Sequence, residues 1–88
     1  MEKRIRRDKF YIIMRILQSI EVGKHKISHI GYSSNLNYNC TQLYLKKLVS
    51  SGLVVEERKG RERHYHLTEK GRKILHKLAE IDELALRE

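Results

Sequence analysis

The order of secondary structure in this chain is set by residues 37–68, NYNCTQLYLKKLVSSGLVVEERKGRERHYHLT. The first half of this stretch predicts a helix over about 38–51, because Asn37 is a good helix cap and Gly52 is a clean stop. Apolar positions recur along one side of the helix at helical spacing; they are Thr41, Tyr44, Leu45, Leu48 and Val49. The other side is polar and free of carboxylates; its residues are Asn39, Gln42, Lys46 and Ser50.

The second half of the stretch predicts a β-hairpin. Two short extended runs, LVVEE (53–57) and HYHLT (64–68), flank the charged turn RKGRER (58–63), and Gly60 lies within that turn. A glycine between two short extended runs is a hairpin signal. The turn region holds the bases Arg58, Lys59, Arg61 and Arg63, whose charge is partly cancelled by Glu56, Glu57 and Glu62.

A helix is expected over residues 9–21, where Asp8 is a plausible cap and Gly23 ends the pattern. Its apolar residues recur at spacings of three and four; they are Phe10, Ile13, Leu17 and Ile20. Ile12 and Ile16 widen this stripe, which is typical of a helix contacted on two sides. A shorter helix is expected next in the chain.

That second helix is predicted over residues 26–32, with a loop at 33–35. The chain ends with a longer helix over about 69–87, capped by Thr68. Its apolar seam has the spacing of a coiled coil; the seam residues are Ile74, Leu78, Ile81 and Ala85. We expect this seam to pair two copies of the chain, with help from Ile12 and Ile16.

The predicted order is helix, helix, helix, strand, turn, strand, helix, which is the winged helix-turn-helix arrangement. It is an α+β fold, mostly α, with three helices, a two-stranded wing and a long C-terminal helix. In this arrangement the third helix enters the major groove of DNA and the wing reaches the backbone. We expect residues 1–68 to form the DNA-binding domain with a basic N-terminal arm, and residues 69–88 to form a dimerisation helix.

The candidate DNA contacts fall into three groups. The third helix and its cap supply Asn37, Tyr38, Asn39, Gln42, Lys46 and Lys47. The wing supplies Arg58, Lys59, Arg61 and Arg63, and the arm supplies Arg4, Arg6 and Arg7. Amide side chains can bond adenine edges, and lysine can reach guanine or phosphate. Tyr38 has two open interpretations, because its ring either stacks on the sugar-phosphate backbone or closes the edge of the core.

Composition limits the other classes of function. A chain of 88 residues favours one domain with a thin core. Its formal charge of +8 favours a polyanionic partner, with nucleic acid ahead of an anionic membrane. The single cysteine, Cys40, excludes an intramolecular disulfide and fits an intracellular setting. No apolar run approaches the roughly 18–20 residues of a membrane span, and we expect no signal peptide and no membrane partner.

Metal, cofactor and catalytic chemistry find little support. Five histidines are present, and His64 and His66 are expected to share a strand face. His25 and His29 share a helix face if the second helix extends back far enough. The chain contains neither C-x-x-C nor H-E-x-x-H, so we expect no metal, no cofactor and no small-molecule ligand. No nucleophile motif or phosphate loop stands out, and we expect a protein that is not an enzyme. Cys40 is interpreted as a half-buried packing residue rather than a redox switch.

Several short motifs resemble a group of small archaeal winged-helix proteins. The matching residues span roughly 7–78 and comprise Arg7-Asp8, Ile30, Tyr32, Asn35-Leu36, Tyr44-Leu45, Leu48, Gly52-Leu53 and Leu67 to Gly71. Two positions depart from the group's pattern, since His29 stands where lysine is preferred and Gly31 where a bulky residue is preferred. The resemblance implies a DNA-binding transcription regulator or chromatin protein. It also implies a dimer formed through a C-terminal coiled coil.

Together these features predict a cytoplasmic, nucleoid-associated homodimer that binds double-stranded DNA at specific sequences and regulates transcription. One alternative is a chromatin or architectural protein that binds DNA without sequence preference. A second is a winged-helix module whose basic face binds an acidic protein, because a fold does not dictate its function.

Overall fold

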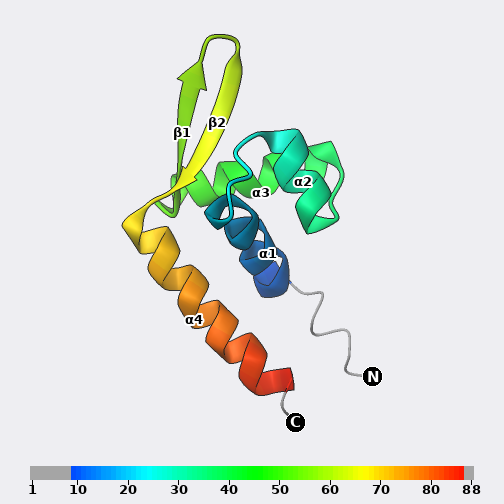
Figure 1. Ribbon diagram of the computed structural model, residues 1–88, viewed down its shortest axis with the longest axis vertical. Coiled ribbons are helices and arrows are strands. Elements are labelled where there is room, and N and C mark those ends of the chain that lie inside the picture. Colours follow the sequence, from blue (N-terminus) through cyan, green and yellow to red (C-terminus); the bar gives the residue numbers. More distant parts are fainter. Residues whose placement is uncertain (1–8, 87–88) are drawn as a thin grey trace.

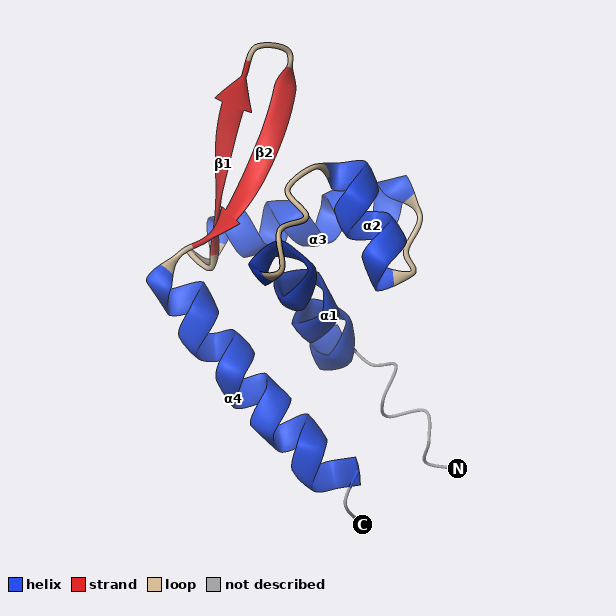
Figure 2. Cartoon of the chain, in the orientation of Figure 1, coloured by secondary structure: helices blue, strands red, loops and turns tan. Residues whose placement is uncertain are grey.

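The computed structural model describes residues 9–86 of the chain. Figure 1 shows a helical body with a β-hairpin standing out at one end and the last helix extending toward the other. Figure 2 shows that helices account for most of the chain, with strands only in the hairpin. The mostly helical α+β fold predicted from the sequence is therefore confirmed. The elements are α1 (Lys9–Glu21), α2 (Ile27–Ser34), α3 (Tyr38–Ser50), β1 (Val54–Lys59), β2 (Glu62–Leu67) and α4 (Glu69–Leu86).

The core forms around α1, which packs against α2, β2 and α4. Every element contributes to it; its buried members are Met14, Ile16, Leu17, Ile20, Ile27, Ile30, Leu45, Leu48, Val54, Tyr65 and Leu75. The expected stripe on α1 was partly wrong, because Phe10 is 62% exposed while Ile16 is fully buried. The buried face of α1 is therefore centred on Ile16 and Leu17.

Helix α2 approaches α3 closely at Gly31. A Cβ added to Gly31 would lie 2.7 Å from Thr41 Oγ1 and 3.1 Å from the Leu36 carbonyl oxygen. The glycine that departs from the archaeal pattern therefore allows the two helices to meet. The predicted loop at 33–35 was wrong in its start, because α2 continues to Ser34. Asn35 ends the helix in the left-handed conformation, with φ of 61°.

The hairpin is longer and its turn shorter than the sequence suggests. Strands β1 and β2 pair antiparallel from Val54 with Leu67 to Lys59 with Glu62. The expected six-residue turn at 58–63 was wrong, because only Gly60 and Arg61 connect the strands. Gly60 has φ of 65°, which suits the first central position of a two-residue hairpin turn.

The connection between α1 and α2 is hydrogen-bonded to β2 through His25. The backbone N–H of Tyr65 donates to the carbonyl oxygen of His25 over 2.9 Å. The His25 ring donates through Nδ1 to the Tyr65 carbonyl oxygen, also over 2.9 Å. His25 and His29 do not share a helix face, because α2 begins only at Ile27.

Helix α4 begins at a cap that also holds β1 in place. The Thr68 hydroxyl accepts a hydrogen bond from the Gly71 backbone N–H over 2.9 Å and donates one to the Gly52 carbonyl oxygen over 2.7 Å. The Thr68 cap expected from the sequence is thus confirmed. Farther along α4, His76 donates to the Glu21 carboxylate over 3.2 Å and ties the helix to the end of α1.

Candidate nucleic-acid interface

The outward face of α3 carries amides and lysines. Asn37 caps the helix, because its side-chain oxygen accepts a hydrogen bond from the Cys40 backbone N–H over 2.8 Å. Asn39, Lys46 and Lys47 are exposed, and neither α2 nor α3 contains a carboxylate. Positively charged and hydrogen-bonding groups without acids are what a surface facing phosphates and base edges requires.

Leu43 also lies on this face, and sequence reasoning missed it. Its side chain is 60% exposed. The signal was available in the helical spacing, because Leu43 falls two residues from both Thr41 and Leu45, which are buried. A step of two residues turns about 200° around a helix, so position 43 points away from the core.

The three carboxylates of the hairpin are all engaged by nearby cations or histidines. Glu56 contacts Arg63 Nε at 3.4 Å. Glu57 accepts a hydrogen bond from His66 Nε2 over 2.9 Å. Glu62 contacts Lys26 Nζ and His64 Nε2, each at 3.1 Å. The acids that partly cancel the wing's charge in the sequence are therefore held along the sides of the hairpin.

The remaining bases of the wing have no ion-pair partner in the described part of the chain. Within residues 9–86, no ion-pair partner contacts Arg58, Lys59 or Arg61, and all three side chains are exposed. They surround the turn at Gly60, the part of the hairpin that stands farthest from the body (Figure 1). A cationic tip of this kind suits contact with a phosphate backbone.

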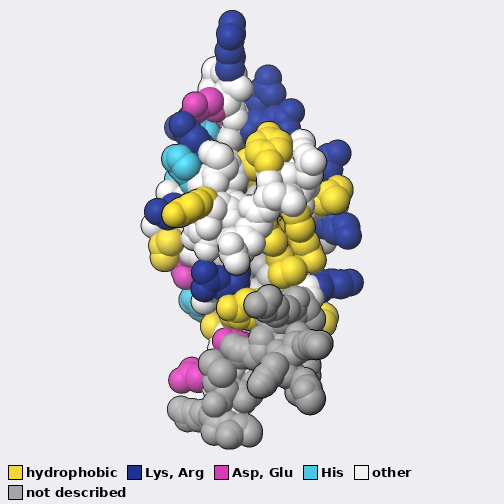
Figure 3. Space-filling model, turned by 90° about the vertical axis from the view of Figure 1, so that its right-hand side faces the viewer, with side chains coloured by type: hydrophobic (Ala, Val, Ile, Leu, Met, Phe, Trp, Pro, Cys, Tyr) yellow, Lys and Arg dark blue, Asp and Glu magenta, His cyan; other side chains and the backbone are white. Residues whose placement is uncertain are grey.

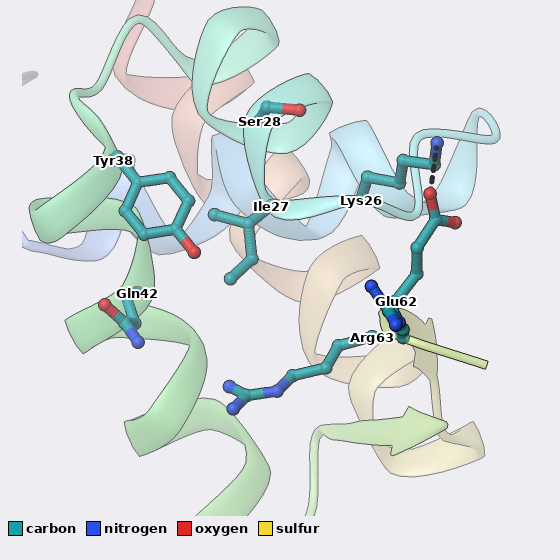
Figure 4. A pocket seen from close by; sticks show the side chains of 8 residues that line it. Lys26, Ile27, Ser28, Tyr38, Gln42, Glu62 and Arg63 are labelled. Carbon is teal, nitrogen blue, oxygen red and sulfur yellow. Dashed lines mark ion pairs between the residues drawn. The ribbon is translucent and has the colours of Figure 1, made fainter. Parts of the chain in front are cut away.

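A hollow of about 390 Å³ separates the wing from the helices. It is lined from three segments of the chain by Lys26, Ile27, Ser28, Tyr38, Gln42, Arg61, Glu62 and Arg63. Figure 4 shows Arg63 extending from β2 toward Gln42 on α3, and Lys26 paired with Glu62. Tyr38 lines this hollow with 57% of its surface exposed and does not close the core. Its contact with sugar-phosphate stays a prediction.

Two ionisable groups of the hairpin have shifted pKa values. The hydrogen bond from His64 and the hydrogen bond and charge of Lys26 lower the pKa of Glu62. Burial raises the pKa of Tyr65, whose ring lies in the core. Glu62 therefore stays ionised at neutral pH and Tyr65 stays protonated.

The charges gather unevenly on the surface. In Figure 3 the Lys and Arg side chains lie at the tip of the wing and along both edges, while acidic and His side chains lie mainly toward one edge. The arm residues Arg4, Arg6 and Arg7 lie outside the described residues. The hollow brings together four of the candidates from α3 and the wing, which are Tyr38, Gln42, Arg61 and Arg63. The other six do not line it; they are Asn37, Asn39, Lys46, Lys47, Arg58 and Lys59.

The residues expected at a subunit contact differ in how deeply they are buried in the subunit's own core. Ile16 was wrongly included, because it is fully buried in the core and out of reach of another chain. Ile12, Ile74 and Leu78 are half-buried and pack against the subunit's own core. Ile81 is 63% exposed. Leu84 was not among the expected residues, but it lies beside the seam and is 70% exposed. The side chain of Ala85 lies outside the described part of the chain.

Comparison with known proteins agrees with this geometry. The family model described as winged helix-turn-helix matches residues 6–86. The chain belongs to the winged helix-turn-helix family. In this winged helix, α2 and α3 form the helix-turn-helix and the β1–β2 hairpin is the wing. A search of curated protein sequences finds no match.

Three solved structures resemble the winged helix closely. Sso10a-2, a DNA-binding protein from Sulfolobus solfataricus, matches with a TM-score of 0.83 and 25% identity over 91% of this chain and 83% of that one. The transcriptional regulator BldR from the same organism matches with a TM-score of 0.81 and 19% identity over 96% of this chain and 64% of that one. The homodimeric winged helix-turn-helix DNA-binding domain of Mb0332 from Mycobacterium bovis matches with a TM-score of 0.65 and 23% identity over 85% of this chain and 68% of that one. The last two likenesses show the fold alone.

Membrane spans and groups of metal ligands are both absent from the described residues. Among residues 9–86, no helix is long and apolar enough to cross a membrane. In the same range, no three His, Cys, Asp or Glu side chains gather as metal ligands do. Cys40 is half-buried at the start of α3. The resemblance to archaeal winged-helix proteins drawn from the sequence is confirmed.

Proposed function

We propose that this winged helix is a homodimeric transcription regulator that binds double-stranded DNA at specific sequences and has no enzymatic activity. Helix α3 enters the major groove, and the wing tip contacts the backbone beside it. The observation that carries the proposal is the acid-free outward face of α3, with exposed Asn39, Lys46 and Lys47. Such a protein acts in the cytoplasm, on the nucleoid.

The wing supports this placement. Its carboxylates are engaged within the subunit, whereas Arg58, Lys59 and Arg61 have no ion-pair partner among the described residues. A duplex seated on α3 would meet three bases that no carboxylate of the described residues already pairs. Phosphate contacts from the wing position the helix, and amides on α3 read bases.

The arm gives a further electrostatic contribution. Arg4, Arg6 and Arg7 precede α1 and add positive charge to the N-terminal end of the chain. Basic arms attract DNA through phosphate neutralisation irrespective of sequence. Their contribution is therefore expected in the salt dependence of binding rather than in sequence preference.

The second half of the α4 seam supports a dimer. Ile74 and Leu78 pack within the subunit, but Ile81 and Leu84 are largely exposed beyond the core. A second copy of α4 would cover these two side chains, and Ala85 and Ile12 lie on elements near that contact. Two-fold symmetry then predicts half-sites one helical turn apart, about 34 Å, or a multiple of it.

A chromatin or architectural function is the second candidate. The observation that favours it is the excess of exposed bases on the wing and α3 over the two amides, Asn39 and Gln42. Six phosphate contacts would produce a log–log salt slope of about −5 on any DNA sequence. A protein-binding module, the third interpretation, would lose its weak DNA binding near physiological salt.

Selection of bound fragments from a random duplex pool at about 150 mM salt separates these functions. An enriched, two-fold symmetric motif is expected. Retention without enrichment would establish the architectural function instead. Failure to retain any DNA would overturn DNA binding and favour a protein partner.

A double substitution tests base reading directly. Removing both amides in N39A/Q42A is expected to weaken binding to the selected motif by more than tenfold, at about 1–3 kcal/mol for each bidentate pair. Binding to unrelated DNA should change little. Ser50→Ala, on the same face of α3, is the matched control. An equal loss on every sequence would contradict base reading.

A further inference from the structure

Leu43 is an apolar side chain at the middle of a polar, basic helix face. Thr41 and Leu45 lie two positions before and after it and are buried, with 0% and 1% of their surfaces exposed. Leu43 itself is 60% exposed. One turn before it lies Asn39, and one turn after it lies Lys46, both exposed. Leu43 therefore projects from the centre of the outward face of α3.

An isolated exposed leucine is ordinary on a protein surface. Leu43 differs because of its surroundings. Residues 22–55 contain no acid, and the bases Lys46 and Lys47 follow Leu43 on the same helix. When this face seats in a major groove, charged groups at its edges meet phosphates and its central side chain meets the base edges.

The major groove displays one apolar group among its base-pair edges, which is the C5-methyl group of thymine. We infer that Leu43 contacts a thymine methyl group and selects thymine at the centre of each half-site. The inference rests on the proposed function and adds a specificity-determining residue to it. Asn39, one helical turn away, is then placed to read a neighbouring base pair.

Uracil provides the sharpest probe, because it pairs as thymine does and lacks only the methyl group. The selected duplex is synthesised with single thymines replaced by deoxyuridine, one position at a time. Affinities for the thymine and uracil duplexes are measured by fluorescence anisotropy with the full chain. Loss of the contacted methyl group should weaken binding about fourfold, because one apolar carbon is then no longer buried in the complex.

Leu43→Ala identifies the residue that makes the contact. The Leu43→Ala variant should bind the thymine and uracil duplexes with equal affinity. The affinity of the wild-type protein for the uracil duplex should be close to that of the variant. The substitution removes an exposed side chain, so circular dichroism and melting should be unchanged. Asn39→Ala is the matched control, because it should weaken binding while retaining the thymine preference.

Each other outcome overturns the inference in a distinct way. Equal wild-type affinity for every uracil duplex would show that no methyl group is contacted, while DNA binding itself stands. A thymine preference that persists in Leu43→Ala would assign the contact to another residue or to DNA shape. Failure to bind any duplex would overturn the proposed function together with the inference.

Discussion

Gly71 on α4 lies directly against the backbone carbonyl of Leu53, and a Cβ at position 71 would overlap that carbonyl group. The same carbonyl oxygen accepts a hydrogen bond from the Thr68 backbone N–H over 3.1 Å. This contact joins the start of the wing to the start of α4. It explains why the segment Leu67 to Gly71 ends in glycine.

Gly71→Ala is therefore expected to destabilise the protein strongly. The carbonyl belongs to the backbone and cannot rotate away as a flexible side chain would. We expect a loss of about 3 kcal/mol in the free energy of unfolding, at the upper end of over-packing costs. Urea denaturation measures this change. Lys73→Ala, exposed on the same helix, should stay within about 0.5 kcal/mol of wild type.

Two substitutions at Asn37 distinguish its role as the cap of α3 from its proposed contact with DNA. Asn37→Ala removes the acceptor for the Cys40 N–H and should cost about 1 kcal/mol of stability. Asn37→Asp retains a cap acceptor and should unfold at nearly the wild-type urea concentration. Its added negative charge should nevertheless weaken DNA binding. Wild-type affinity in Asn37→Asp would place position 37 outside the DNA interface.

Alkaline pH should destabilise the core through Tyr65. Burial raises the pKa of Tyr65 above its ordinary value of 10.0, so the unfolded chain loses this proton first. The associated stability is present below about pH 10 and is lost as pH rises through the folded pKa. The free energy of unfolding of Tyr65→Phe, measured by urea denaturation, should therefore fall less than that of wild type between about pH 9 and 11, the range around the ordinary pKa of 10.0. Parallel pH profiles would exclude Tyr65 as the cause.

The wing bases should act on all DNA sequences alike. The double variant K59A/R61A should reduce the magnitude of the log–log salt slope by about 1.8, because each neutralised phosphate contributes roughly 0.9 to that slope. Its sequence preference in the random-pool selection should be unchanged. K73A/K77A removes the same charge from the exposed side of α4 and should leave the slope near wild type. Equal slopes in all three proteins would remove the wing from the interface.

The exposed end of α4 should control the oligomeric state. I81E/L84E places two carboxylates where the apolar contact is proposed and should convert a dimer into a monomer in sedimentation equilibrium. Both side chains are largely exposed in the subunit, so its helix content should not change. Glu80→Lys, also exposed on α4, should remain dimeric. A wild-type monomer at micromolar concentration would contradict the proposed dimer.

The amino-acid sequence alone determined the order and approximate bounds of the helices. Those features depend on neighbours within one turn, such as the Asn37 cap three residues before Cys40 and the Thr68 cap three residues before Gly71. It also identified the polar face of α3, because the helical repeat separates Thr41 and Leu45 from the residues between them. The hairpin was predicted from Gly60, although its strands were placed too short.

Only the tertiary structure decided which surfaces remain available. Contacts between residues far apart in sequence buried Ile16, joined His25 to Tyr65 and paired Lys26 with Glu62. Burial and ion pairing depend on how the elements pack, and no local spacing encodes that packing. For this reason the sequence alone could count the bases of the wing, but the fold was needed to show that its acids are engaged within the subunit.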